Sequence, residues 1–596
     1  MYRDTSYRFA GFTLVPSQRQ LLKGAVEVAL RPKSFHTLVC LVERRGEVVT
    51  KDELLNLVWP DVNVSEEVLT HCIAEVRGAL SDDSRHPRFV KTISRHGYKF
   101  IADTSRVGAA DPGAARPAPP TGGDASAPPA SAIVVLPFAN ISDDPGNEYL
   151  CDGLAEELIN ALTKVGGLQV VAHSSSFSFK GRDVDAREIG RQLQAGTILE
   201  GSVRKTGDRL RVSAQLIDAA RGYHLWSEQY DRRLEDIFAL QDELARAILD
   251  NLKPALFERP VPPAKPSSAR VEAYLLHLQG RAFWHQRYGG FLERAMDCFG
   301  RAIAADPGFA PSYAGLADSL AVQGIWGLAR AHEVYPKASA SAALALDPRL
   351  AEAHASRAQL RMFWDWEWHE AERGLRRGLE LNPGSAFIRL LFGHYLSIVG
   401  RMEDALAEMR TARTFDPLSP ICGANVGFTC HLAHRQDEAI GELQRVLART
   451  PENGLALFYL GWALIAVGRH DEAIEALGRA HAVTRGMPFS FEGIGLAHAL
   501  AGRRDRARAI LAEVQARSAT AYTPSSAFAA LLVGLDDHEG ALGWLERAVD
   551  ERDAMLPWLR FMPCFDGLHA QPRFRTVLGR IGLLPPSPAG EPIHTA

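Results

Sequence analysis

The sequence predicts a multidomain chain that combines an α+β domain, a small α/β domain and an all-α solenoid. Strand-like and helix-like patterns alternate over residues 133–258, whereas residues 270–582 are helical throughout and repeat at regular intervals. Residues 104–132 consist mostly of Ala, Pro, Gly and Ser and have no hydrophobic period, which predicts a linker. Because 596 residues are too many for one hydrophobic core, we expect three folded parts.

The composition is that of an ordinary globular protein, with 46% apolar and 23% charged residues. The formal net charge is −4, so any binding of nucleic acid must come from a local basic patch. The seven cysteines include no CxxC pair, which argues against a disulfide framework or a zinc site. The chain begins with the polar stretch MYRDTSYRFA and has no apolar run long enough for a membrane helix. We therefore expect a cytoplasmic protein with no membrane segment, metal or cofactor.

Residues 5–103 show four strand-like runs, then three helical segments, then a hairpin. Pro32 lies in the first turn of the first helix, and Thr50 and Ser65 are N-cap residues for the other two. The expected strands are Tyr7–Phe9, Phe12–Val15, Gln20–Leu22 and Val26–Leu30; the helices are Pro32–Glu43, Lys51–Val58 and Glu66–Leu80; the hairpin strands are Phe89–Ile93 and Tyr98–Ala102.

This order, with the phrases RPKSFHTLVCLVERRGEVVTKDELLNLVWPD and VKTISRHGYKF, resembles the OmpR/PhoB-type winged helix-turn-helix domain of transcriptional regulators. The resemblance implies that the third helix enters the DNA major groove and that the hairpin, the wing, reaches the neighbouring minor groove. The amino-terminal place of the domain is similar to CadC- and HilA-like regulators, although no membrane helix is expected after it here.

The third helix has one apolar stripe, formed by Leu69, Ile73, Val76 and Leu80, and an opposite face for DNA. Thr70 and His71 can hydrogen-bond bases, Ala74 can contact a thymine methyl group, and Glu75 can accept a bond from cytosine but repels phosphate. The candidate DNA-binding residues are Thr70, His71, Ala74, Glu75 and Arg77 on the helix, and Lys91, Thr92, Arg95, His96 and Tyr98 on the wing.

The positive charge lies around the wing. Residues 77–99 hold six cations and two aspartates, a net charge of 6 − 2 = +4. Phosphate contacts from such residues supply most of the affinity for DNA, and Arg95 at the wing tip suits the minor groove. The alternatives are a solvated basic hairpin and, for Glu66 and Glu67, no more than a favourable interaction with the helix dipole.

The α/β region resembles the TolB amino-terminal-like domain through IVVLPFANISDDPGNEYLCDGLAEELINAL and LEGSVRKTGDRLRVSAQLIDAARGYHLWSEQYDR. The expected helices are Asn147–Val165, Asp185–Ala195 and Asp236–Leu256, with a hairpin around Thr206–Asp208. The resemblance is nearly silent on function, and a small ligand is the other interpretation. We expect His173 to lie in a loop after a strand and the pair Asp143 and Asp144 to lie in a solvated turn.

The solenoid resembles tetratricopeptide repeats, about eight of them. Prolines that end repeats follow one another at steps of 41, 35, 34 and 34 residues, from Pro307 to Pro451. Small residues recur twelve apart, as in Gly393 and Ala405, where paired helices must approach closely. The tryptophans of FWDWEWHEAE, residues 363–372, are expected to pack a helix junction, with peptide binding as the alternative.

These features favour a bacterial regulator that binds double-stranded promoter DNA in a sequence-specific way, with a homodimer on tandem half-sites as the expected arrangement. The α/β and repeat regions would sense a ligand, or a protein or peptide partner on the repeats. The alternative is an adaptor with a vestigial DNA-binding domain, which Glu67 and Glu75 on the reading face favour. An enzyme is not expected, because the sequence contains no GxxxxGK[ST], HExxH or GxSxG motif.

Overall fold

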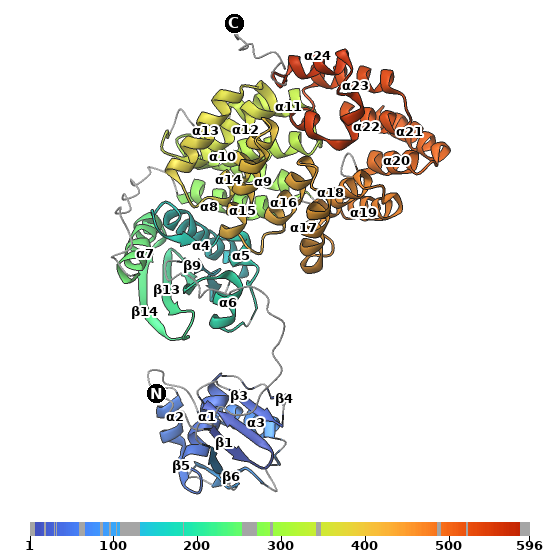
Figure 1. Ribbon diagram of the computed structural model, residues 1–596. Helices are drawn as coiled ribbons and strands as arrows, with labels where there is room; N and C mark the ends of the chain where they lie inside the picture. The colour runs from blue at the N-terminus through green and yellow to red at the C-terminus, as the bar shows by residue number, and fades with distance from the viewer. Residues whose placement is uncertain are drawn as a thin grey trace. The chain divides into compact units, whose positions relative to one another are not determined.

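The computed structural model describes residues 6–107, with gaps at 17–19, 25, 29, 31, 59–65, 81, 84–86, 94–96 and 103, and residues 132–584, with gaps at 143, 183, 253–270, 287–289, 341–346, 485–489 and 520–521. The chain divides into two compact units, Met1–Asp124 and Ala125–Ala596, each of which is described by itself (Figure 1). The expectations for Ser65, Arg95, His96 and Asp143 concern positions outside the described residues.

An antiparallel sheet with the strand order β4-β3-β2-β1-β8 opens unit 1. Its strands are β1 (Ser6–Phe9), β2 (Phe12–Val15), β3 (Gln20–Lys23), β4 (Val26–Glu27) and β8 (Ser105–Val107). The sequence predicts the first four but not β8, whose three residues have no strand pattern of their own. Because β8 pairs with β1 and covers the open edge of the sheet, the expected start of the linker at residue 104 moves past Val107.

Three helices follow at the predicted bounds, α1 (Pro32–Glu43), α2 (Lys51–Val58) and α3 (Glu66–Leu80). A capping box begins α2: Thr50 Oγ1 accepts from the Glu53 amide at 3.2 Å, and Glu53 Oε2 accepts from the Thr50 amide at 2.8 Å. This reciprocal pair satisfies amides that the helix itself leaves without partners, which explains why the predicted start is correct.

A second sheet, ordered β5-β7-β6, closes the unit. The hairpin strand β6 (Val90–Ile93) lies within the predicted range, whereas β7 (Gly97–Phe100) begins one residue before the predicted start at Tyr98. The strand β5 (Val48–Thr50) was not predicted. The ring of Phe9 on β1 lies 6.0 Å from that of Phe89 and 5.1 Å from that of Phe100 between ring centroids. These contacts join the two sheets in one core.

Gly97 is required where β7 meets β5. It pairs with Thr50, and an added Cβ would lie 2.0 Å from the carbonyl oxygen of Val49. That neighbour is backbone, so the strand itself would have to move. A glycine at position 97, the first residue of β7, is thus needed for β7 to pair with β5 in the three-stranded sheet.

Unit 2 begins with a mixed sheet in the order β11-β9-β12-β13-β14, with β10 paired to β12. The strands are β9 (Ala132–Val135), β10 (Ala139–Asn140), β11 (Gln169–Val170), β12 (Thr197–Thr206), β13 (Arg209–Asp218) and β14 (His224–Arg233); the helices are α4 (Glu148–Leu162), α5 (His173–Phe177), α6 (Ala186–Leu193) and α7 (Ile237–Asn251). Ile133 and Val135 join the core with α4 and α7, whereas Val134 joins the core beside α6. Burial on both faces explains the unbroken apolar run of β9.

In the rest of unit 2, the described residues form helices joined by short turns. They are α8 (Val271–Gln286), α9 (Phe291–Ala305), α10 (Ala310–Ile325), α11 (Ala331–Ala340), α12 (Ala351–Leu360), α13 (Trp368–Leu381), α14 (Ala386–Ile398), α15 (Met402–Phe415), α16 (Pro420–Leu432), α17 (Gln436–Arg449), α18 (Gly454–Ala466), α19 (His470–Val483), α20 (Ser490–Leu500), α21 (Arg504–Ser518), α22 (Ser525–Gly534), α23 (His538–Glu551) and α24 (Pro572–Arg580). From α8 to α23 they pack as consecutive pairs, the arrangement of a tetratricopeptide solenoid (Figure 1). None of the described helices has both the length and the apolarity needed to cross a bilayer.

The recurring glycines of the array make room for one large side chain each. A Cβ added at Gly393 would lie 2.8 Å from the side chain of Met409, and one added at Gly461 would lie 2.4 Å from the side chain of Leu477. Both partners lie sixteen residues further on along the chain, in the second helix of the pair. The alanines at twelve, such as Ala405, are fully buried, so both positions serve the close approach of the paired helices.

The tryptophans of residues 363–372 pack against the far end of the array, as expected of a junction. Arg552 lies over the rings of Trp364 and Trp366, at 5.4 and 4.2 Å from the ring centroids. The Trp368 indole donates to the carbonyl of Ile581 at 2.9 Å. These contacts link α12 and α13 to the last helices of the chain.

The α/β part and the array are joined within unit 2 by buried polar contacts. Asp416 Oδ1 accepts from the amide of Ser175 at 2.8 Å and from its hydroxyl at 2.6 Å, and the same hydroxyl accepts from the Leu418 amide. Ser175 belongs to α5, whose first residue is His173. The expectation of a loop at His173 is therefore wrong: a short helix forms there because its polar groups are bonded by the array.

We expect Gly97→Ala to lower the free energy of unfolding of unit 1 by about 1–3 kcal/mol, because the strand pair must separate to admit the methyl group. Denaturant unfolding of the fragment Met1–Asp124 measures it. Gly78→Ala is the matched control, since no atom lies within 4 Å of its added Cβ and the change removes a helix glycine. Equal effects of the two substitutions would contradict the close approach at Gly97.

Candidate nucleic-acid interface

The predicted reading helix α3 has the predicted faces. Leu69, Ile73, Val76 and Leu80 are buried in the core of unit 1. On the other side Thr70, Ala74 and Gly78 are exposed. These exposed residues are small and uncharged, so the helix can approach the floor of a groove closely without bringing a carboxylate to it. The side chain of His71 lies outside the described residues.

Glu75 lies at the edge of this exposed face and also contacts α1. Its Oε2 accepts a hydrogen bond from the hydroxyl of Ser34 on α1 at 2.9 Å, and the side chain is half-buried. Ser34 is itself buried. The carboxylate therefore holds α3 against α1, which directs its charge toward the protein and reduces the repulsion of phosphate that the sequence suggests.

Arg77 has a structural role of the same kind. Its Nη2 donates to the carbonyl of Val90 at 2.8 Å and to the hydroxyl of Thr92 at 2.9 Å. Both acceptors lie on β6, so this guanidinium fixes the end of α3 to the wing. Arg77 and Thr92, two residues predicted to bind DNA, are thus bonded to each other.

Asp82 was not singled out from the sequence. Its carboxylate accepts from the amides of Arg88, Phe89 and Val90 at 2.6, 3.2 and 2.8 Å. These bonds shape the turn that carries the chain from α3 into β6. The Asp82 carboxylate is therefore directed at backbone amides, whereas the side chain of Asp83 is exposed.

The wing places two lysines opposite each other. Lys91 on β6 is paired with Lys99 on β7, and Lys91 is exposed. Like charges directly opposite in a sheet destabilise it unless an anion lies nearby. The pair is therefore costly for the free protein and suited to contact a phosphate.

Tyr98 does not fit the role that the sequence suggested. It is 5% exposed, and its ring belongs to the core of unit 1 with Phe89 and Phe100. The Gly-Tyr motif predicts a tyrosine at the wing, but the periodicity of the strand turns this side chain inward. Of the remaining wing residues, Arg95 and His96 lie outside the described residues.

Two family profiles match the chain. Residues 25–100 match the family described as "Transcriptional regulatory protein, C terminal", and residues 130–247 match "HilA/YgeH-like transcriptional regulator, second domain". The first profile covers α1, α2, α3 and the wing; the second covers the α/β part of unit 2.

Two relatives extend these matches. The transcriptional regulator HilA of Salmonella typhimurium (strain LT2) is 26% identical over 415 residues, which are 68% of this chain and 69% of the relative. The putative adenylate cyclase 3 of Rhizobium meliloti (strain 1021) is 43% identical over 190 residues, 31% of this chain. The chain spans only about a third of the length of that relative, 32%.

The chain therefore contains a winged-helix DNA-binding domain of the kind found in transcriptional regulators, followed by a HilA-like domain. Its first domain is OmpR/PhoB-type and its second is HilA-like. The solved DNA-binding domain of E. coli CadC matches at 28% identity over 17% of this chain and 98% of that chain, with a TM-score of 0.16. The resemblance of the second domain to TolB stays a prediction.

We expect Lys91→Ala to weaken DNA binding evenly across sequences and to reduce the slope of log affinity against log salt by about 1, because one phosphate contact is lost. Titration of labelled DNA at several salt concentrations measures the slope. Lys23→Ala removes an exposed charge of the same sign from β3, in the other sheet, and should leave the slope unchanged. Identical slopes for both variants and the unchanged protein would show that Lys91 contacts no phosphate.

Proposed function

We propose that unit 1 reads a specific promoter sequence through α3 and the wing, and that unit 2 controls this binding in response to a ligand or a protein partner. The observation that carries the proposal is the contrast on unit 1. The exposed face of α3 is small and neutral, whereas the wing beside it presents Lys91 and Lys99. A helix of that kind suits base contacts, and paired lysines suit the phosphate backbone.

On this proposal some of the predicted residues contact DNA and the others hold the reading helix and the wing in position. Thr70, His71 and Ala74 contact base edges, and Lys91, Arg95 and His96 contact the backbone and the minor groove. Glu75, Arg77 and Thr92 hold the reading helix in position, as their bonds to Ser34 and within the α3–wing pair support. Tyr98 supports the wing from the core and does not contact DNA.

The proposal includes a homodimer on tandem half-sites about one DNA turn apart, as winged helices of this type tend to bind. It also includes a cytoplasmic location, where a promoter is accessible, and a protein or peptide partner on the helical array. We propose no enzymatic activity; the adenylate cyclase of the relative from Rhizobium meliloti is not extended to this chain. Of the two glutamates that favour the adaptor alternative, Glu75 bonds Ser34, whereas the side chain of Glu67 lies outside the described residues.

Selection of genomic fragments by the chain Met1–Asp124 and by the full chain, at several salt concentrations, tests the function. The fragment includes β8, which completes the first sheet. We expect both to enrich the same sequence, with footprints of two half-sites. Enrichment no greater than that of random DNA, from a fragment that unfolds cooperatively, would contradict sequence-specific binding and would favour the adaptor.

A further inference from the structure

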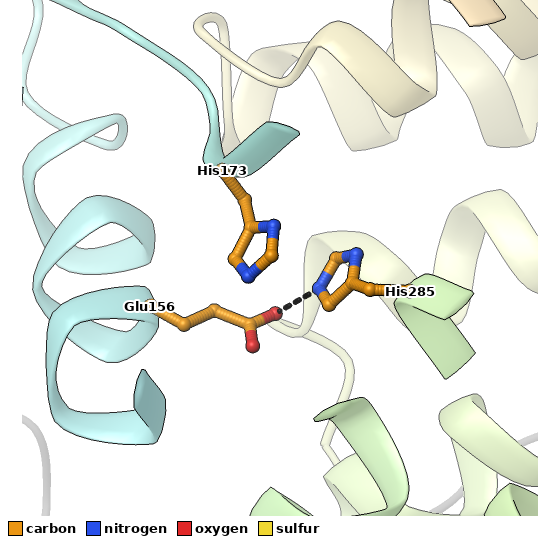
Figure 2. A group of neighbouring side chains, drawn as sticks. All are labelled: Glu156, His173 and His285. Atoms are coloured by element: carbon orange, nitrogen blue, oxygen red, sulfur yellow. Dashed lines mark hydrogen bonds and ion pairs between the residues drawn. The ribbon is translucent and has the colours of Figure 1, made fainter. Parts of the chain in front are cut away.

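Three side chains that can bind a metal ion meet inside unit 2. They are Glu156 on α4, His173 at the start of α5 and His285 on α8, and their ligand atoms lie within 4.8 Å of one another (Figure 2). The sequence separates them by up to 129 residues, so no motif indicates the group. Two come from the HilA-like domain and the third from the first helix of the array.

Glu156 lies at the centre of the group. Its Oε1 accepts from Arg281 Nε and Nη2 at 2.9 and 2.6 Å and lies 3.0 Å from His285 Nε2. All three bonds end on Oε1, which leaves Oε2 as the oxygen that a cation can take. The His173 ring is stacked on that of His285, with centroids 3.6 Å apart, and on that of Phe177 at 3.7 Å.

The cavity beside the group attracts a cation. Its volume is about 290 Å³, and the side chains that line it include five carboxylates (Glu156, Glu157, Asp318, Glu352 and Asp416) and two cations (Lys164 and Arg281). Two oxygens on this wall, Asn382 Oδ1 and Glu352 Oε2, are buried without a hydrogen-bond partner, and Asn382 is 2% exposed. Oxygens in that state favour a group that donates hydrogen bonds, such as metal-bound water.

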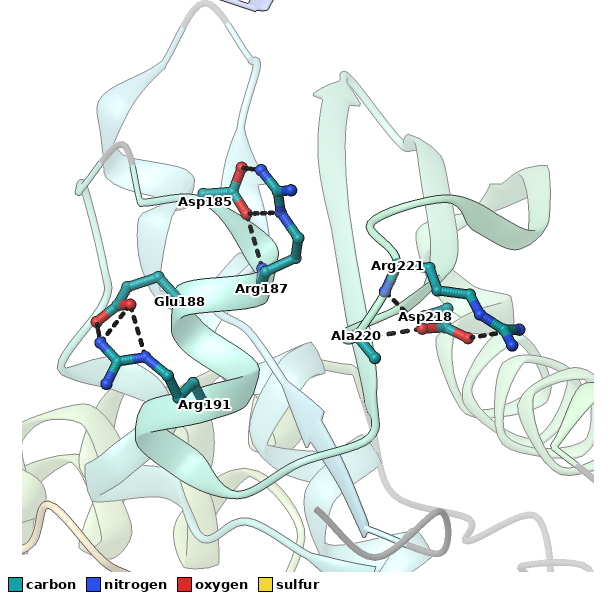
Figure 3. Close-up of polar contacts among 7 residues, drawn as sticks. All are labelled: Asp185, Arg187, Glu188, Arg191, Asp218, Ala220 and Arg221. Atoms are coloured by element: carbon teal, nitrogen blue, oxygen red, sulfur yellow. Dashed lines mark hydrogen bonds and ion pairs between the residues drawn. The ribbon is translucent and has the colours of Figure 1, made fainter. Parts of the chain in front are cut away.

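Exposed charge clusters elsewhere in unit 2 differ from this group. Around α6 and the turn after β13, Asp185 accepts from the Arg187 amide at 2.9 Å and Asp218 accepts from the Ala220 amide at 3.0 Å (Figure 3). Glu188 and Arg191 form an exposed pair three residues apart. These carboxylates cap a helix and a turn, and no imidazole accompanies them in the group drawn.

We propose that Glu156, His173 and His285 bind one divalent transition-metal ion of the zinc type, with a fourth position open to the cavity. Two histidines and one carboxylate with an open position form a known zinc arrangement. The rings of His173 and His285 are stacked, so the lone pairs of their nitrogens run parallel and do not converge on one point. One of the two rings must therefore rotate toward the cavity to bind the same ion, and the cavity provides the space. Binding of the ion through His285 Nε2 releases any proton on that nitrogen to solvent.

The bound ion ties α4, α5 and α8 together. It therefore acts at the junction between the HilA-like domain and the array, where binding of the ion makes the contact between the two parts more rigid. This goes beyond the proposed function, since it supplies a chemical class for the signal that unit 2 senses.

The test is a titration of the chelator-treated full chain with Co²⁺, followed by visible absorption, and then with Zn²⁺ in competition. We expect one Co²⁺ per chain, displacement by Zn²⁺ and a higher melting temperature of unit 2. His173→Phe, which preserves the stacked rings, should weaken Co²⁺ binding by about 100-fold or more. Burial raises the pKa of Cys151 and of Cys430 to about 12, which disfavours the thiolate form that a metal ligand needs.

His277→Gln is the matched control. His277 lines the same cavity but bonds Ser312 Oγ at 3.2 Å and is outside the group, so this variant should bind Co²⁺ as the unchanged chain does. Failure of the unchanged chain to bind Co²⁺ would overturn the site, as would equal losses in both variants or binding that persists in His173→Phe. DNA selection by Met1–Asp124 does not involve these residues, so it distinguishes failure of this site from failure of the proposed function.

Discussion

The bonds from Arg77 to β6 are the interaction on which the DNA-binding unit depends. A reading helix can address a base sequence only if its distance and angle to the wing are fixed, since both elements must meet the duplex together. The guanidinium bonds one backbone carbonyl and one hydroxyl of β6. Glu75 performs the complementary task at the other side of α3, where it accepts from Ser34 on α1.

This use of charge resolves an apparent contradiction in the sequence. An acidic residue on a reading helix opposes DNA binding if it faces the phosphates, but Glu75 is bonded to α1. Asp82 is similarly directed at three backbone amides. On the wing, Lys91 and Lys99 lie opposite each other, and Lys91 is exposed. On this account the helix α3 fits the groove of the DNA, and the lysines of the neighbouring strand pair supply affinity through phosphate contacts.

Local signals in the sequence predicted the local structure of this chain well. The three helices of unit 1 have the expected bounds because a proline in the first turn and the Thr50–Glu53 capping box act within a few residues. Strands β5 and β8 were missed, because each is held by pairing with a strand far away in the sequence. Tyr98 was misjudged for a related reason: a motif gives the residue type, but strand pairing decides which way it points.

In the candidate sites, too, features set by nearby residues could be predicted, whereas contacts between residues far apart in the sequence could not. The exposed and buried faces of α3 follow from helical periodicity, so Thr70 and Ala74 could be predicted. The partners of Glu75 and Arg77 could not, because Ser34 and Thr92 lie 41 and 15 residues away from them. For the metal-binding group the sequence offered no signal at all: Glu156, His173 and His285 are brought together only when the array packs on the α/β domain.

A double-mutant cycle between Arg77 and Thr92 tests the central claim most directly. The free energy of unfolding of Met1–Asp124 would be measured for Arg77→Ala, Thr92→Val and the double variant. The account predicts that the two substitutions are coupled by about 0.5–3 kcal/mol, as expected for residues that share a hydrogen bond. Additive effects, within about 0.3 kcal/mol, would contradict it and would return Arg77 to the set of side chains available for DNA.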